Sequence, residues 1–279
     1  MTDPQPTRQS KTLEDDWHDY LMGTHPEIVR GRRTFGWLPS DPRCRACHSP
    51  FHGIGSLLMR NFGYTPWEKN PNICKRCVVQ FSKRGIAGAE IELTMLFADV
   101  RGSTELAEGT SGTAFSALIN RFYEVGSKVL IEQDALIDKF VGDEVIGLFI
   151  PLLTGELHAA RAIEAAQDLL GETGHGDPSG PWVPLGIGVH TGIARVGMVG
   201  TPGAVMDFTA LGDSVNIAAR LASNAAAGEI LVSDACVRAA TFDVGGREHR
   251  ELRLKGKTEP VGAPVVGVRS GEPAVAAAR

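Results

Sequence analysis

The stretch DKFVGDEVIGLF, residues 138–149, places four charged residues within an otherwise apolar segment. Asp138 and Lys139 come before the pair Gly142-Asp143, and Glu144 follows it. Glycine next to aspartate is typical of a tight turn. We therefore predict a hairpin of the strands ALIDKF and VIGLFI, with the turn VGDE between them. The charged side chains at its tip belong either to a solvent-exposed turn or to a functional site. The surrounding sequence has to distinguish these two possibilities.

Helices and strands alternate on both sides of this hairpin. The apolar run IELTMLFADV (91–100) predicts a strand, and apolar residues at helical spacing over 113–133 predict a helix. After the hairpin we predict a helix at 157–170, strands at 182–192 and 194–200 joined by a turn at Thr191-Gly192, a helix at 213–223, and strands at 228–234, 251–256 and 265–270. This order predicts an α+β fold with helices on one face of a largely antiparallel sheet.

The composition limits partners and compartment. The chain has 279 residues, 43% of them hydrophobic, and a formal net charge of −5. It can bury a core, but it has no electrostatic reason to bind nucleic acid or an anionic membrane. No apolar run approaches the roughly 18 residues of a membrane span, and the start, MTDPQPTRQS, has no signal-peptide pattern. We expect a cytoplasmic protein with no membrane insertion.

Changes in amino-acid composition divide the chain into four parts. Residues 1–35 are polar and predict an N-terminal tail with one short helix. Residues 36–85 are rich in Cys, Pro, Gly and His, which is typical of a small module stapled by a metal. The α+β domain is predicted over 88–270, and residues 271–279 are predicted to be disordered.

Two aspartates stand at predicted strand ends. Asp99 follows the apolar residues MLFA, where a carboxylate is costly to bury unless it is paired or binds a cation. Asp143 lies in the hairpin turn. If the two strands are neighbours, the carboxylates converge, and divalent cations such as Mg²⁺ would relieve their repulsion. The alternative is local: Asp99 caps a turn and Asp143 is an ordinary turn residue.

Two further segments carry polar groups that suit a phosphate ligand. Gly102, Ser103 and Thr104 form a small, flexible turn that can aim backbone N–H groups at a phosphate. Asn216 and Arg220 are four residues apart on the predicted helix 213–223 and so share a face. Arginine suits phosphate contact and developing charge, while the alternative for this pair is a solvated helix face.

Three segments together resemble the class III nucleotidyl cyclase family, the adenylate and guanylate cyclases. They are FADVRGST (97–104), DKFVGDEVIGLF (138–149) and TALGDSVNIAARL (209–221), in the family's order and spacing. The likeness runs from about Ile91 to Val268. It implies a ferredoxin-like βαββαβ core, a dimer with active sites at the subunit interface, and conversion of a nucleoside triphosphate into the 3′,5′-cyclic monophosphate and pyrophosphate.

The resemblance also implies roles for single residues. Asp99 and Asp143 resemble the aspartates that bind two Mg²⁺ or Mn²⁺ ions per active site. Asn216 resembles the asparagine that orients the ribose, and Arg220 resembles the arginine that stabilises the transition state. Lys255 resembles a lysine that meets the terminal phosphates, with Lys257 as the alternative if the alignment is shifted. Lys139, Asn216 and Arg220 would come from one subunit, and the two aspartates from the other.

Lys139 resembles the lysine that reads the base in adenylate cyclases. Lysine has only donors, which suits the acceptor N1 of adenine, whereas a glutamate would suit guanine. Many relatives have an aspartate three residues before the glycine of Gly212-Asp213, but here Thr209 stands there. Threonine both donates and accepts, so it can still meet the adenine N6 group or Lys139. Relatives with threonine form a subgroup, some of them bicarbonate-responsive.

Four of the five cysteines form two C-x-x-C pairs, CRAC (44–47) and CKRC (74–77), separated by 26 residues. Cys44, Cys47, Cys74 and Cys77 suit one structural Zn²⁺. The alternatives are an iron–sulfur cluster or reversible disulfides, and His48 and His52 are alternative ligands. Cys236 lies alone in a predicted short helix and is interpreted as a packing residue.

We therefore predict an adenylate cyclase that acts on ATP as a homodimer. Fewer than about fifteen residues join the cysteine pairs to the strand at 91–100, too few for a loose tether. We expect the cysteine module to regulate the cyclase, for instance by setting how two subunits meet. The alternatives are a guanylate cyclase and a catalytically weak cyclase-like domain that serves as a sensor or binding module.

Overall fold

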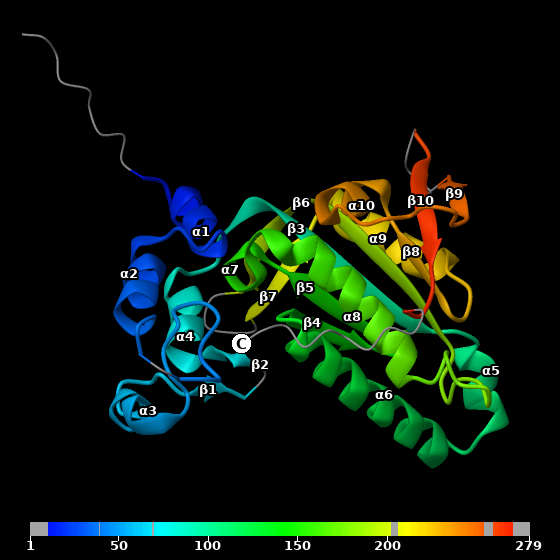
Figure 1. Ribbon diagram of the computed structural model, residues 1–279, viewed down its shortest axis with the longest axis horizontal. Helices are drawn as coiled ribbons and strands as arrows, with labels where there is room; N and C mark the ends of the chain where they lie inside the picture. Colours follow the sequence, from blue (N-terminus) through cyan, green and yellow to red (C-terminus); the bar gives the residue numbers. More distant parts are fainter. Residues whose placement is uncertain (1–10, 39, 69, 202–205, 254–258, 270–279) are drawn as a thin grey trace, which may run out of the picture.

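The strand β3 (Gly88–Val100) is the centre of the fold (Figure 1). Its apolar side chains alternate between the two sides of the sheet, and both sides are buried. β3 pairs antiparallel with β5 (Glu144–Phe149) along one edge and with β6 (Leu185–Gly200) along the other. The computed structural model describes residues 11–38, 40–68, 70–201, 206–253 and 259–269.

A βαββαβ unit forms the core of the sheet. It runs through β3, α6 (Gly112–Glu132), β4 (Leu136–Val141), β5, α8 (His158–Glu172) and β6. The strands lie in the order β4-β5-β3-β6, with the first and third strands of the unit in the middle. This arrangement confirms the predicted ferredoxin-like α+β fold, and the hairpin of β4 and β5 confirms the prediction for residues 135–150.

The remaining elements extend this core. They are α5 (Ser103–Gly109), α7 (Pro151–Thr154), η1 (Gly155–Leu157), β7 (Met206–Leu211), α9 (Asp213–Asn224), β8 (Glu229–Val232), α10 (Asp234–Ala240), β9 (His249–Leu252) and β10 (Val261–Val266). β7 pairs antiparallel with the second half of β6, whereas β8 runs parallel to its first half. The sheet is therefore mixed, although antiparallel pairs dominate.

Helices cover both faces of the sheet. α6 and α8 pack on the face that carries Leu96, Ala98 and Val100. α9 packs on the opposite face over Gly188, where an added Cβ would lie 2.2 Å from the backbone nitrogen of Ala222. The expectation of helices on one face is therefore wrong. The apolar stripe of a helix does not say which face it covers, and here the glycines of β6 admit α9 to the second face.

β6 is one continuous strand of 16 residues, so the predicted turn at Thr191-Gly192 is wrong. The Thr191 hydroxyl lies 2.6 Å from the hydroxyl of Thr94 on β3, and the Thr94 hydroxyl lies 2.8 Å from Nδ1 of His158. A Cβ added at Gly192 would lie 2.6 Å from Oγ of Ser214 on α9. These residues serve strand pairing and close packing rather than a change of direction.

Residues 13–35 form two helices rather than a tail with one short helix. α1 (Leu13–Leu21) begins with a capping box formed by Thr12 and Asp15, and α2 (Pro26–Phe35) follows after four residues. The fully buried side chains of α1 are Trp17, Tyr20 and Leu21. The prediction for residues 1–35 needs this correction because the partners that bury these side chains lie far away in the sequence.

The cysteine-rich segment folds into short elements. They are α3 (Gly53–Arg60), β1 (Pro66–Trp67), β2 (Asn70–Cys74) and α4 (Lys75–Lys83). Together with α1 and α2 they make up residues 12–84, which we call the N-terminal module. Its blue and cyan helices gather at one end of the molecule, beside the large sheet (Figure 1).

The N-terminal module is docked on the sheet through both apolar and polar contacts. The ring of Phe81 lies 5.8 Å from that of Trp17 and 5.0 Å from that of Phe208 on β7. Arg45 Nε lies 2.7 Å from Oδ1 of the buried Asp134. Only residues 84–87 separate α4 from β3, and the module and the sheet share one apolar cluster. The link is not a loose tether.

Some sequence predictions fall outside the described residues. Lys255 and its alternative Lys257 lie in the segment 254–258, and the tail 271–279 lies beyond residue 269. Within the described part of the chain, no helix combines the length and the apolar character needed to cross a bilayer.

Candidate functional site

The sheet brings Asp99 and Asp143 to the same place. Asp99 lies opposite Glu144 in the antiparallel pair of β3 and β5. The backbone N–H of the next residue, Val100, donates to the carbonyl of Asp143 at 3.2 Å. Gly142 forms the hairpin turn with φ +63°, a conformation that favours glycine. The predicted convergence of the two strand-end aspartates is therefore present in the backbone.

Charge in this corner is mostly negative. The guanidinium of Arg101 contacts the Asp99 carboxylate, and its Nη1 donates to the Ser223 carbonyl at 3.2 Å. Burial first, and the neighbouring charge of Asp143 second, raise the pKa of Glu144 to about 7. The carboxyl groups of Asp99, Asp143 and Glu144 surround the single guanidinium of Arg101, so negative charge is in excess. Carboxylate oxygens are the ligands that hard divalent cations prefer, so this donor set fits Mg²⁺ or Mn²⁺.

Lys139 and Thr209 lie in a second group, and Asp138 joins them. The Thr209 hydroxyl donates to Oδ2 of Asp138 at 3.1 Å, and Lys139 Nζ lies 3.5 Å from the same oxygen. Asp207 Oδ2 lies 3.7 Å from Lys139 Nζ. Burial raises the pKa of Asp138, and Lys139 and the Thr209 hydroxyl oppose that rise. The lysine therefore has carboxylate partners in Asp138 and Asp207.

Sequence reasoning noted Asp138 as a hairpin charge and gave it no role. In a regular strand, neighbouring side chains point to opposite faces of the sheet. The sequence therefore predicts that Asp138 and Lys139 do not touch. The pairing of β4 with β5 shifts register between Ile137 and Lys139. No sequence signal marks that irregularity, so the contact between the two side chains was not predictable.

Asn216 and Arg220 share one side of α9, as predicted. Asn216 is exposed and Arg220 is half-buried. Among the described residues, neither side chain makes a hydrogen bond or ion pair with either aspartate or with Lys139. Within one chain, the side chains of Asn216 and Arg220 thus connect α9 neither to the aspartate corner, formed by Asp99 and Asp143, nor to the group around Lys139.

The predicted phosphate-binding turn starts a short helix. Gly102 has φ +67° and is the N-cap of α5, and Ser103 and Thr104 form its first turn. The turn directly follows the aspartate corner, because β3 ends at Val100. Its position agrees with the sequence prediction, and its role stays a prediction.

The four paired cysteines form a compact cluster inside the N-terminal module. All four sulfur atoms lie within 4.8 Å of one another. The Cys44 and Cys77 sulfurs are 4.0 Å apart, and those of Cys47 and Cys74 are 3.7 Å apart. Four sulfurs at about 2.3 Å from a tetrahedral zinc ion would lie about 3.8 Å apart. The spacing fits a single tetrahedral ion.

Backbone donors support this cluster. The N–H of Cys74 donates to Sγ of Cys44 at 3.3 Å, and the N–H of Cys77 donates to Sγ of Cys74 at 3.4 Å. Such hydrogen bonds stabilise sulfur ligands that carry negative charge. In the described part of the chain this metal-ligand group contains cysteines alone, without His48 or His52.

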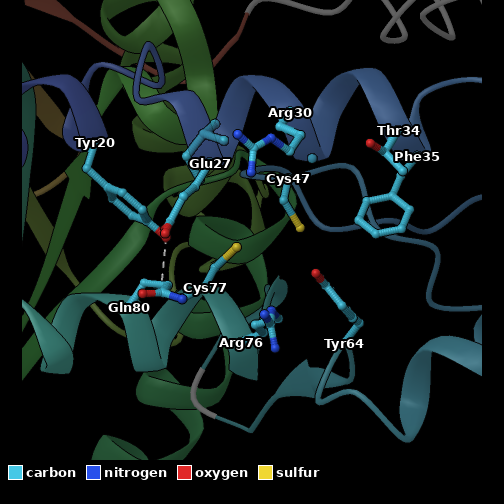
Figure 2. A pocket seen from close by; sticks show the side chains of 12 residues that line it. Tyr20, Glu27, Arg30, Thr34, Phe35, Cys47, Tyr64, Arg76, Cys77 and Gln80 are labelled. Atoms are coloured by element: carbon cyan, nitrogen blue, oxygen red, sulfur yellow. Dashed lines mark hydrogen bonds between the residues drawn. The ribbon is translucent and has the colours of Figure 1, made fainter.

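A pocket of about 300 Å³ opens beside the cluster, between α2 and α4. Figure 2 shows the sulfur atoms of Cys47 and Cys77 pointing into the space between these helices. Arg30, Tyr64 and Arg76 line the same pocket. Two of the four sulfurs therefore face a space that a small molecule can enter, although neither cysteine is more than 5% exposed.

Cys236 is separate from this cluster. It is fully buried in α10, where burial raises the pKa of its thiol to about 12. A buried, protonated thiol is a packing residue, which confirms the interpretation from the sequence.

Comparison with known families gives one extended match. The sequence profile of the adenylate and guanylate cyclase catalytic domain matches residues 88–263. These residues run from β3 into the first half of β10 and include both aspartates, Lys139, Thr209 and α9.

Individual relatives agree with this match. An adenylate cyclase of Anabaena cylindrica is 32% identical over 139 residues, which cover 48% of this chain and 28% of that protein. Adenylate cyclase 1 of Rhizobium meliloti is 32% identical over 142 residues, covering 49% of this chain and 21% of that protein. The chain thus matches less than a third of the length of these two relatives.

Solved structures give a similar result. The guanylyl cyclase Cya2 has a TM-score of 0.59 and 27% identity, covering 68% of this chain and 98% of that one. The adenylyl cyclase CyaB from P. aeruginosa has a TM-score of 0.56 and 30% identity, covering 66% of this chain and 98% of that one.

Proposed function

The chain belongs to the family of adenylate and guanylate cyclase catalytic domains, and on that basis we propose that it converts ATP into 3′,5′-cyclic AMP and pyrophosphate. The observation that carries the choice of ATP is the environment of Lys139. Its ammonium group, a donor, is held beside Asp138, which also binds Thr209. A fixed donor suits N1 of adenine and opposes the N1–H of guanine.

Asp99 and Asp143 are the proposed ligands of two Mg²⁺ or Mn²⁺ ions. Their common position at the ends of β3 and β5 supports this role, as does the excess of carboxylates around them. When bound, such ions would lower the pKa of the ribose 3′-hydroxyl and offset the charge of the phosphates. Arg101, which contacts Asp99 here, would have to release that carboxylate for the ions.

The other proposed roles belong to α9 and to two loops. Asn216 would orient the ribose, and Arg220 would stabilise charge that develops on the α-phosphate. Backbone N–H groups of Gly102–Thr104 would face the phosphates. Lys255 would meet the terminal phosphates, and it lies outside the described residues.

We propose that the active site forms between two copies of the chain. The separation of α9 from the aspartate corner within one chain supports this arrangement. Exposed apolar side chains on β4, β6 and β7 also support it, because such side chains mark interaction surfaces. They are Phe140, Val141, Ile193, Met206 and Leu211. A two-fold dimer would have two equivalent sites.

A guanylate cyclase is the second candidate, since the guanylyl cyclase Cya2 is among the structurally similar proteins. Cyclic nucleotide formed from ATP and from GTP, with Mg²⁺ and then Mn²⁺, separates the two. Cyclic AMP from ATP that disappears in Asp99→Ala would support the main proposal. A preference for GTP would favour the second candidate, and no product from either would favour a catalytically weak, cyclase-like sensor.

For the N-terminal module we propose one structural Zn²⁺ on the four cysteines. The short spacing between sulfurs supports a single ion over an iron–sulfur cluster, whose iron and sulfide atoms need more room between the ligands. Because residues 84–87 connect α4 directly to β3, we also propose that the module regulates the cyclase. Reduced cysteines of this kind suit the cytoplasm.

The regulatory proposal has its own test in the full-length chain. Cys74→Ser removes one zinc ligand, and its metal content, cyclase rate and dimer dissociation constant would be compared with those of the wild type. We expect loss of zinc together with a changed rate or a weakened dimer. A folded variant without zinc that kept the wild-type rate and dimerisation would refute regulation by the module.

A further inference from the structure

We call Lys139, Thr209, Asp138 and Asp207 the base-reading group. Asp138 is the most buried carboxylate of this group. Its side chain is 6% exposed, whereas that of Asp207, the other carboxylate near Lys139, is 57% exposed. Oδ2 of Asp138 accepts the hydrogen bond of the Thr209 hydroxyl. Oδ1 has no hydrogen-bond partner among the described residues. Burying a carboxylate is costly unless it is paired and hydrogen-bonded, and here Lys139 and Thr209 are the partners.

The contact with Asp138 fixes how Thr209 can bind a ligand. A hydroxyl has one hydrogen to donate and lone pairs to accept with. Oδ2 of Asp138, at 3.1 Å, is closer to the Thr209 hydroxyl than the second acceptor, the Ala210 carbonyl at 3.5 Å. With its hydrogen directed to Asp138, the hydroxyl offers the ligand an acceptor only. The ambiguity of threonine, which can both donate and accept, is thereby removed.

Lys139 and Thr209 then present a defined pair, one donor and one acceptor. Adenine has the complementary pattern, with N1 as an acceptor and the 6-amino group as a donor. Purines with a 6-oxo group have the reverse pattern, an N1–H donor and an O6 acceptor. Such a base would place donor against donor and acceptor against acceptor, and an unpaired polar group in a site is strongly disfavoured.

We propose that Asp138 is a positioning residue that determines base specificity: by taking the hydroxyl hydrogen of Thr209 and holding Lys139, it selects 6-aminopurine over 6-oxopurine nucleotides. The inference rests on the proposed function, since it concerns the base of the cyclase substrate. It assigns the discrimination to three side chains, of which Asp138 acts through the other two.

The N-terminal module contributes side chains to a pocket that Asp138 also lines. A cavity of about 190 Å³ is lined by Asp138, Asp207 and Phe208 on the cyclase side and by Trp67 and Phe81 on the module side. The apolar walls keep the carboxylate away from bulk water, which strengthens its hydrogen bond to Thr209. The module is thus part of the surroundings that hold the base-reading group.

The test compares ATP with inosine triphosphate, which differs only in carrying the 6-oxo pattern. In Asp138→Asn the new amide can donate to Thr209 and free its hydroxyl hydrogen for the base. We expect the ratio of kcat/KM for ATP over inosine triphosphate to fall at least about fivefold, the scale of one hydrogen bond. Asp207→Asn, which also removes a carboxylate near Lys139, is the matched control and is expected to keep the ratio.

A double-mutant cycle shows whether Asp138 acts through Thr209. In a Thr209→Val background, Asp138→Asn should change the ratio less than it does in the wild type, because only its contact with Lys139 remains to be lost. An equal loss of kcat for both nucleotides at an unchanged ratio would overturn the proposal and leave Asp138 a purely structural role. The same effect of Asp138→Asn with and without Thr209 would overturn it too.

Binding separates this inference from the proposed function. Competition of ATP and of inosine triphosphate against a fluorescent ATP analogue gives the same ratio as dissociation constants, even if turnover is weak. A wild type that prefers ATP but is unaffected by Asp138→Asn would refute the inference alone. A wild type that prefers 6-oxo nucleotides would refute the choice of ATP, and with it the inference.

Discussion

The backbone N–H of Val100 donates to the carbonyl of Asp143 at 3.2 Å. This bond ties the end of β3 to the hairpin turn of β4 and β5, so the main chain fixes the positions from which Asp99 and Asp143 act. The side chains can therefore be changed without moving the strands.

We expect Asp99→Asn and Asp143→Asn each to lower the rate of cyclic nucleotide formation by at least about 10²-fold, because a neutral amide is a poor ligand for divalent cations. Cyclic AMP measured by chromatography, with saturating Mn²⁺, checks this. Thermal unfolding should change little, since both side chains are partly exposed. Full activity in either variant would contradict the metal role.

Lys139→Glu should reverse the preference for the base. Glutamate places an acceptor against N1 of adenine, so kcat/KM for ATP should fall by about 10²-fold. The ratio of kcat/KM for GTP to that for ATP should rise. Lys139→Met, which removes the charge without reversing it, is the control and should lose ATP activity without a gain for GTP. An unchanged ratio of ATP to GTP in Lys139→Glu would show that this lysine does not read the base.

Removal of metal from the cysteine cluster should destabilise the protein. Elemental analysis is expected to give one zinc per chain, and chelation should lower Tm by about 10 °C, because binding energy at such sites is folding energy. A protein that carries iron, with the visible absorbance of a cluster, would contradict the zinc assignment.

His158 predicts a pH dependence of stability. Burial lowers the pKa of its imidazole, although Glu92 opposes this. The folded state thus favours the neutral ring, whose contribution is present above the unfolded pKa near 6.5 and is lost as pH falls through the folded pKa. His158→Gln, which can still bond to Thr94, should flatten the loss of unfolding free energy below pH 6.5 by up to about 1.4 kcal/mol per pH unit. Identical slopes in urea titrations of both proteins would contradict this.

Trp17 tests whether α1 is docked in solution. Its ring is fully buried against Phe81 and Phe208, so Trp17→Ala should cost about 3–5 kcal/mol of unfolding free energy. Leu13 on the same helix is 53% exposed, and Leu13→Ala should cost less than about 1 kcal/mol. Similar costs for the two variants would mean that α1 is not packed on the sheet.

The sequence was most informative where a local pattern decides the structure. Asp99 was predictable because it follows an apolar run, and Asp143 because it follows Gly142 in the turn between β4 and β5. The cysteine cluster was predictable from its two C-x-x-C pairs. In these cases the partners of each residue are close in sequence or share a chemistry that leaves few options.

Long-range contacts were not predictable. The burial of Trp17 and Tyr20 was not predictable, because Phe81, whose ring packs on both, lies more than fifty residues away. Thr191-Gly192 looked like a turn because the hydroxyl of Thr94 and the close approach of Ser214 are invisible in the local sequence. The contact between Asp138 and Lys139 depends on an irregular register in β4, which the sequence does not mark.

The apolar cluster that the N-terminal module shares with the sheet determines where a shortened version of the chain can begin. The family match begins at residue 88, which suggests a convenient expression boundary. A chain started there would lose Trp17, Phe81 and their neighbours, and with them part of the apolar cluster that the module shares with β3. We expect such a fragment to aggregate in the host, so the unit to clone is the whole chain from before Thr12.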